Sequence, residues 1–333
     1  MRSIHTLPTL LLSLLSLSCH AAETREPDAG ADHMASFACM LPGEWQVTFQ
    51  SGTSMHHTWS WGPGEHSITR VTDGSGAGGE PWRSLHVYYW HPGLEEIRSL
   101  SLSPYARGVG EGPMTFDGTS GHAELTLHQT PGPRTMATRW TFDGPDAYVD
   151  ELLEDTGSGY ETLVALKLER SNTIAERVVH GIEHAPEPTM FLQALTPMID
   201  EVWTTSIDSR STTIETTVER IPHADYVHVQ SHAVTMQGDR SLVLDAYAYH
   251  HTGTGRLRGL ALTADGGVHE GTWTVLEDGR VEFDATSYLG DAVASRTIQL
   301  GVNEDGVLRQ QVWSIEDAQR ILERDSRHTP RRR

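Results

Sequence analysis

Two arginines and two glutamates recur at matching places in the two halves of the chain. Arg98 and Arg258 each lie in a strand-like segment, on the same face as two leucines. A charge on an apolar face needs a partner, because burying an unpaired charge is very costly. Glu111 and Glu270 follow one predicted hairpin later, so folding the hairpin brings Arg98 close to Glu111. We expect either structural ion pairs or arginines that hold a ligand's carboxylate inside the fold.

Aromatic residues and histidines accompany these pairs. The candidates for a ligand-binding role are Tyr89, His91 and Trp45 in the first half and Tyr249, His251 and Trp203 in the second. Tyrosine and tryptophan suit the wall of a wet cavity, and they suit equally a core in which their polar tips find partners. The tryptophans open the two halves at equivalent places, and we expect them to seal one end of the fold more readily than to stack on a ligand. The histidines lie at turns, where polar residues are common.

No segment carries a catalytic or metal-binding signature. Adjacent histidines such as His56 and His57 point to opposite faces of a strand, and His228 and His232 stand roughly 13 Å apart at strand rise. The chain has no His-Glu-x-x-His, no paired Cys-x-x-Cys and no Gly-x-Ser-x-Gly. The glycine-rich segment 74–79 has no helix behind it to hold a phosphate, so we expect a loop. The sequence predicts no metal site and no catalytic residue.

An internal repeat organises these residues. Trp45 matches Trp203, the segment 91–98 aligns without gaps to 251–258, and 108–112 aligns to 267–271, at a shift of 158 to 160 residues. A nearly constant shift over this much chain indicates a duplication. We expect one copy at 34–171 and the other at 190–325, with a polar linker at 172–189. Residues 326–333 are expected to form a short basic tail.

The residue pattern within each copy has a period of two. Segments such as 124–129 and 280–285 alternate apolar and polar side chains, and Asp-Gly turns separate them. Short strands with regular turns and no intervening helices predict an antiparallel meander that closes on itself, because closure removes exposed edges. The fold class is therefore all-β: two tandem antiparallel barrels, each led by a short helix at 37–41 or 190–199.

The N-terminus predicts export. Arg2 precedes an apolar run at 7–17, and small residues follow, so 1–21 has the form of a signal peptide and 22–33 of an acidic linker. Cys19 offers an alternative as a lipidated first residue. The net charge of −20 argues against nucleic-acid or anionic-membrane partners. No segment is apolar over enough length to span a bilayer.

Each copy resembles the calycin-like small barrels, which include lipocalins, fatty-acid-binding proteins, nitrobindins and bacterial domains of unknown function. The resemblance rests on the helical lead into Gly43-Glu44-Trp45, a tyrosine-rich strand, the turn at 91–93 and the hairpin ending at 108–112; the second copy has Glu201 in place of the glycine. It implies a ligand cavity, with an arginine that holds a carboxylate as in fatty-acid binders. Nitrobindins bind haem through a histidine on the last strand. Strand 161–168 has none, so no haem or other cofactor is expected.

These observations favour an exported, non-enzymatic protein that binds a small molecule, such as a carboxylate or a lipid-like compound, with one modest cavity in each barrel. Two alternatives stay open. One is a lyase or hydrolase whose site uses Arg98, Glu111 and their counterparts. The other is an interaction module with filled barrels. The oligomeric state is not predicted.

Overall fold

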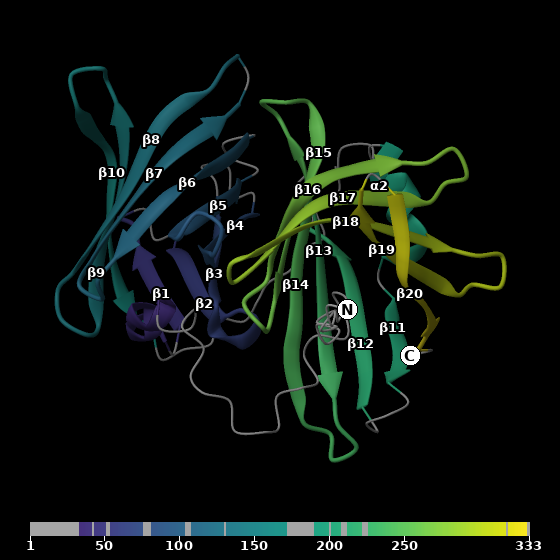
Figure 1. Cartoon of the computed structure of the whole chain (residues 1–333). Helices are drawn as coiled ribbons and strands as arrows, with labels where there is room; N and C mark the ends of the chain where they lie inside the picture. The colour runs from purple at the N-terminus through teal and green to yellow at the C-terminus, as the bar shows by residue number, and fades with distance from the viewer. Residues whose placement is uncertain are drawn as a thin grey trace, which may run out of the picture.

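The computed structural model describes residues 33–331 except 42, 51–53, 76–80, 104–107, 130, 172–189, 200, 208–211, 222–225 and 318. The predicted signal peptide, most of the acidic linker, the linker between the copies and residues 332–333 lie outside the described residues. The predicted fold class is confirmed: the chain forms two closed antiparallel barrels of ten strands each (Figure 1).

Each barrel is an up-and-down meander that its first and last strands close. Barrel 1 comprises β1 (Gly43–Thr48), β2 (Ser54–Trp61), β3 (Ser67–Ser75), β4 (Pro81–His91), β5 (Glu96–Ser103), β6 (Gly108–Phe116), β7 (Ser120–His128), β8 (Arg134–Phe142), β9 (Ala147–Asp155) and β10 (Tyr160–Arg170). Barrel 2 comprises β11 (Val202–Ile207), β12 (Thr212–Arg220), β13 (Tyr226–Val234), β14 (Arg240–His251), β15 (Arg256–Thr263), β16 (Val268–Val275), β17 (Val281–Leu289), β18 (Ala292–Val302), β19 (Leu308–Glu316) and β20 (Gln319–Pro330). The short strand contacts β1–β10 and β11–β20 complete the two cylinders.

The Asp-Gly turns lie where the sequence predicts them. At the β6–β7 turn, Gly118 has a φ of +90°, a conformation that a residue with a Cβ rarely adopts. The Asp117 carboxylate accepts the backbone N–H groups of Thr119 and Ser120, each at 2.7 Å. Local turn chemistry of this kind fixes the register of the hairpins.

A short helical lead covers one end of each barrel, as predicted. In barrel 1 it is η2 (Ala35–Met40); in barrel 2 it is α2 (Met190–Leu195) followed by η4 (Thr196–Met198). Trp45 and Trp203 are buried beneath these leads, and their indole N–H groups donate to the carbonyl oxygens of Met40 (3.0 Å) and Met198 (3.1 Å). The equivalent bonds in both copies show the two tryptophans fastening the leads onto the barrels.

The two barrels pack side by side through β4–β6 and β14–β16 (Figure 1). Leu100 and Leu102 of β5 lie in one buried cluster with Leu260 and Leu262 of β15. Their neighbours Ser99 and Ser101 have the opposite parity and point into barrel 1. The leucine-bearing face is therefore the seam between the barrels. The sequence interpretation that placed this face inside a barrel was wrong, because the second barrel covers the outside of the first.

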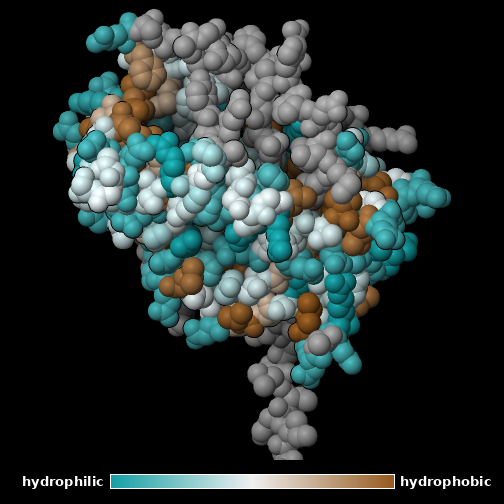
Figure 2. Space-filling model, turned by 90° about the horizontal axis from the view of Figure 1, so that it is seen from above, coloured by the Kyte–Doolittle hydropathy of each residue, from teal (hydrophilic) through white to brown (hydrophobic). Residues whose placement is uncertain are grey.

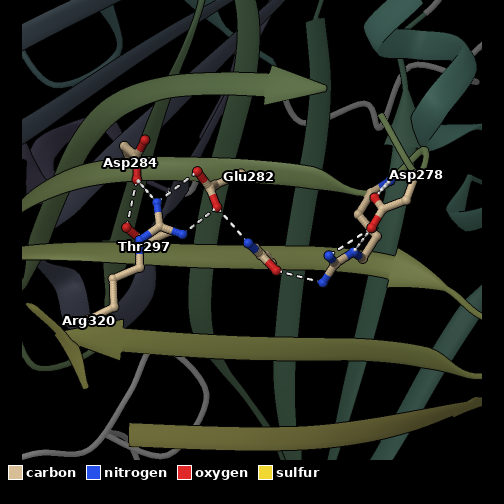
Figure 3. A network of polar contacts seen from close by, with 7 residues as sticks. Asp278, Glu282, Asp284, Thr297 and Arg320 are labelled. Atoms are coloured by element: carbon tan, nitrogen blue, oxygen red, sulfur yellow. Dashed lines mark hydrogen bonds and ion pairs between the residues drawn. The ribbon is translucent and has the colours of Figure 1, made fainter. Parts of the chain in front are cut away.

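A network of hydrogen bonds and ion pairs links β17, β18 and β20 on the outer wall of barrel 2 (Figure 3). Arg320 of β20 reaches Glu282 of β17 with two hydrogen bonds of 2.8 and 3.0 Å, and Thr297 of β18 donates to Asp284 at 2.6 Å. The Gln299 amide extends the network, donating to Glu282 at 2.6 Å. This network fastens the last hairpin to the rest of the wall. Strand β20 then continues through residues 326–330, which the sequence analysis assigned to a tail.

Apolar side chains on the face shown in Figure 2 form small separate groups among hydrophilic ones. No helix among the described residues is long and apolar enough to cross a membrane.

Candidate functional site

A cavity of about 90 Å³ lies inside barrel 2, beneath its helical lead. Most of its lining is apolar: Leu195, Met198, Val218, Val227, Val229, Leu244, Ala246, Ala248, Ala261, Trp273, Phe283, Ile298, Leu300 and Leu308. Its polar lining residues include Thr216, Ser231, Gln310 and His328. An apolar wall with a few polar groups is the usual composition of a small-molecule site.

Barrel 1 carries much larger side chains at the matching positions. The register relates the barrels residue by residue, because Trp45 faces His57 in β1–β2 just as Trp203 faces Thr216 in β11–β12. By the same rule, Val218, Ala248, Leu300 and Leu308 occupy the places of Trp59, Tyr88, Trp140 and Tyr148. All four aromatic residues are buried; the rings of Trp59, Tyr88 and Trp140 contact one another, and the Tyr148 ring contacts those of Trp45 and Phe142. The two barrels therefore share a backbone plan, and barrel 1 fills with aromatic rings the space where barrel 2 is hollow.

A buried ion pair takes part in filling barrel 1. The Arg70 guanidinium lies 2.7 Å from the Asp150 carboxylate, with side-chain exposures of 5% and 12%. Asp150 also accepts the indole N–H of Trp140 at 3.1 Å. In barrel 2 the matching residues are the uncharged Val229 and Gln310. The middle of barrel 2 thus lacks both the rings and the ion pair of barrel 1.

His328 is a polar residue of the cavity wall with unused hydrogen-bonding capacity. Its side chain is almost fully buried, and its Nδ1 has no hydrogen-bond partner among the described residues. Its Nε2 lies 3.3 Å from Oγ of Ser326, and that hydroxyl can donate onward to Gln310 at 3.4 Å. When the Ser326 hydroxyl donates to Gln310, it accepts a hydrogen bond from Nε2 of His328, and Nδ1 of His328 is left as an acceptor. Burial, aided by Arg324, lowers the pKa of His328 to about 4, so the ring is neutral at pH 7.

We expect His328 to make the protein less stable in acid. The folded state holds this ring neutral down to about pH 4, whereas the unfolded chain protonates it near pH 6.5. Stability is therefore lost as the pH falls from about 6.5 to about 4, and for this one group the loss approaches about 3 kcal/mol. The control is His328→Leu, which introduces the residue that barrel 1 has at the matching position, Leu168. Urea unfolding of both proteins from pH 7 to pH 4 should show the wild type losing more stability than the variant; parallel losses would contradict the assignment.

Two reciprocal polar clusters cross the seam between the barrels. Tyr89 of barrel 1 donates to Glu270 of barrel 2 at 2.7 Å, and Tyr249 of barrel 2 donates to Glu111 of barrel 1 at 2.8 Å. His91 and His251 approach the same two carboxylates at 3.5 and 3.4 Å. Because equivalent residues exchange equivalent contacts, the seam has the form of a two-fold interface.

Backbone turns orient both histidines. The N–H of Leu94 points at Nδ1 of His91, and the N–H of Thr254 points at Nδ1 of His251, each at 3.2 Å. Nδ1 of each ring therefore accepts a hydrogen bond, and Nε2, which faces the glutamate, carries a hydrogen. Burial alone would raise the pKa of Glu270, but hydrogen bonds from His91 and Tyr89 outweigh it, so the pKa is lowered. The carboxylate remains charged in the seam.

The structure corrects the predicted pairing of Arg98 with Glu111. Arg98 lies opposite Pro113, and its guanidinium contacts Glu96 at 2.9 Å. Glu111 instead faces Arg258 of the other barrel at 3.5 Å. Most of the predicted site residues do come together, but at the seam and not inside a barrel. The two tryptophans lie apart from them, under the helical leads.

Each seam tyrosine is expected to contribute measurably to stability. Tyr89→Phe or Tyr249→Phe removes the donor to a largely buried carboxylate, which should cost about 1–2 kcal/mol of unfolding free energy. The control is Tyr160→Phe on the exposed wall of barrel 1, which should change the unfolding free energy by less than about 0.5 kcal/mol. Denaturant unfolding provides the comparison. Equal effects at the seam and on the wall would show that the tyrosine bonds contribute nothing.

Sequence reasoning missed two histidines. His328 fell within the predicted tail, although the repeat shift places it at the position of Leu168 on the last strand of its barrel. His128 drew no attention because its partners lie far away in sequence; its ring is 4.4 Å from that of His251. For both histidines, a residue-by-residue alignment of the two copies was the signal that the sequence offered.

Comparison of the chain with protein-family models and with curated proteins finds no match.

Proposed function

We propose that this is an exported, non-enzymatic protein that binds a small, mainly apolar molecule inside barrel 2. The observation that carries the proposal is the cavity of about 90 Å³, at a place where the sister barrel has aromatic rings. A hollow apolar interior costs stability, because its lining side chains lose contacts they would make in a filled core. A ligand that fills the space restores those contacts. In this proposal barrel 1 is the filled, rigid partner, and the seam holds the two together.

The size of the cavity limits the ligand. A dry cavity of about 150 Å³ accepts benzene, so the present one suits a molecule of one small ring or a short branched chain. Nδ1 of His328 is a hydrogen-bond acceptor that has no partner within the described part of the chain, so the ligand should carry one donor, such as a hydroxyl group. A compact alcohol meets both conditions, and phenol, at the upper limit of this size, is the simplest aromatic probe of them.

The calycin-like resemblance supports a binder, and it raises the question of haem again. The last strand of barrel 1 has no histidine that could bind haem iron. The last strand of barrel 2 does carry one, because His328 points toward the interior of that barrel. The cavity does not fit the group: sites for ligands of drug size or larger occupy about 300–1,000 Å³, against about 90 Å³ here. We therefore propose a ligand much smaller than a porphyrin.

Phenol and benzene are the probes that test the proposal. Calorimetric titration should show both binding to the wild type at one site per chain, with phenol preferred through its donor to His328. His328→Leu removes the acceptor and should weaken phenol by about 1 kcal/mol, roughly fivefold in Kd, while benzene changes little. If neither compound binds, the cavity is not a ligand site of this class. If His328→Leu leaves phenol binding unchanged, the role of His328 is refuted.

A further inference from the structure

One of the two seam clusters gathers three metal-ligand side chains. Glu111 of β6, His128 at the end of β7 and His251 at the end of β14 each present a ligand atom, and these atoms lie within 4.8 Å of one another. They come from both barrels and from positions far apart in sequence. We call these three residues the two-histidine cluster.

The contact between Glu111 and His251 has the spacing of two zinc ligands. The Glu111 Oε2 and His251 Nε2 atoms are 3.4 Å apart. That is long for a good hydrogen bond, but two ligands on a tetrahedral zinc, at bond lengths of about 2.0–2.1 Å, stand about 3.3–3.4 Å apart. Two histidines with one carboxylate form a zinc-ligand set that leaves a fourth position open. Glu111 and His128 are both only partly buried, so the ion can enter and a water can complete the shell.

The matching cluster provides an internal comparison. Glu270 and His91 hold the same relation at 3.5 Å, but Tyr288 takes the place of His128, with its ring 4.6 Å from that of His91. A tyrosine hydroxyl is not among the usual zinc ligands. The repeat therefore preserves the glutamate–histidine contact in both clusters and adds the third ligand in one of them only.

The local turn makes room for that third ligand. A side-chain carbon at Gly253 would lie 2.6 Å from Nδ1 of His128, so only glycine allows the ring to approach His251 this closely.

We infer that Glu111, His128 and His251 form a zinc site that bridges the two barrels. Glu111 uses Oε2 for the ion and keeps Oε1 for the hydroxyl of Tyr249. Ligation through Nε2 moves the ring hydrogen of His251 to Nδ1, and the N–H of Thr254 retains its bond of 3.1 Å to the His251 carbonyl oxygen. Arg258, 3.5 Å from Oε2, competes with the ion and has to turn away; its side chain is 32% exposed and free to do so.

Zinc titration of the purified, untagged protein tests the site. Equilibrium dialysis with metal analysis should give one tightly bound zinc per chain, and calorimetry should give its Kd. His128→Tyr gives the cluster the composition of its counterpart and should weaken this zinc at least 100-fold. Tyr288→His makes the reverse change and should raise the stoichiometry from one zinc to two. Arg258→Gln removes the competing charge and should tighten binding.

Three results would overturn the inference: no saturable zinc in the wild type, an unchanged Kd in His128→Tyr, or a Tyr288→His chain that stays at one equivalent. Circular dichroism of each variant confirms the barrel fold. The Tyr288→His result is a gain of binding, so it stays decisive even if His128→Tyr fails to fold.

Discussion

Ala248→Tyr should abolish phenol binding, with a Kd raised by at least 100-fold. The substitution introduces into barrel 2 the residue that barrel 1 has at the same position, Tyr88. In barrel 1 that ring contacts Trp59 and Trp140, with centroids 5.8 and 5.2 Å away. In barrel 2 the ring would enter the cavity that Ala248 lines, and no space would remain for a ligand. Calorimetric titration with phenol measures the effect.

The matched control is Met236→Tyr, which places the same ring at a turn residue that is 78% exposed, and which should leave the Kd unchanged. Inserting a ring into a core costs about 1–3 kcal/mol where the space is too tight, so stability has to be measured alongside binding. A second filling variant, Leu300→Trp, copies Trp140 and should act in the same way. Phenol binding at wild-type affinity in both folded filling variants would show that the ligand binds elsewhere.

Asp150→Ala should lower the free energy of unfolding by about 3–5 kcal/mol. The carboxylate is the ion-pair partner of Arg70, whose side chain is only 5% exposed. Nε of Arg70 already has no hydrogen-bond partner in the described part of the chain, so the guanidinium has little left to compensate for the loss. Its contacts with the faces of Trp59 and Trp140, at 5.5 and 5.6 Å, are weaker than a buried ion pair.

A surface ion pair supplies the control for this prediction. Arg309 and Asp325 are 49% and 34% exposed, and Asp325→Ala should cost less than about 1 kcal/mol. The double variant Arg70→Met with Asp150→Leu should recover most of the loss, because replacing both charges leaves neither unpaired. Guanidinium unfolding at pH 7 gives all the values. A cost below 1 kcal/mol for Asp150→Ala would mean that water reaches Arg70.

The sequence was sufficient to predict the duplication, the strand pattern and the helical leads, because each depends on local periodicity or on a constant shift along the chain. It was not sufficient to say which face of a strand points inward. Leu100 and Leu102 have the residue type of a core face, but Ser99 and Ser101 point into the barrel. A second barrel on the outside reverses the usual rule, and nothing local in β5 indicates that contact.

The candidate residues were therefore identified correctly as a group but assigned to the wrong place. Glu111 has its partners Tyr249 and Arg258 in the other copy, about 140 residues away in the chain. An argument that considers only the neighbouring strand of a hairpin cannot predict contacts between residues so far apart in sequence. His328 could have been found by extending the repeat alignment to the last strand. The contrast between a filled and a hollow barrel could also have been read from Tyr88 and Ala248, which align at the same shift as His91 and His251.

The central claim is that barrel 2 holds a small molecule in its interior. The most direct measurement is mass spectrometry of the exported wild-type protein and of Ala248→Tyr, under native and denaturing conditions. We expect the wild type to carry an additional mass of a one-ring compound or smaller that disappears on denaturation, and we expect Ala248→Tyr to lack it. A wild type with the same mass under both conditions, together with no saturable binding of phenol or benzene, would contradict the claim and favour a protein whose barrels serve only as an interaction scaffold.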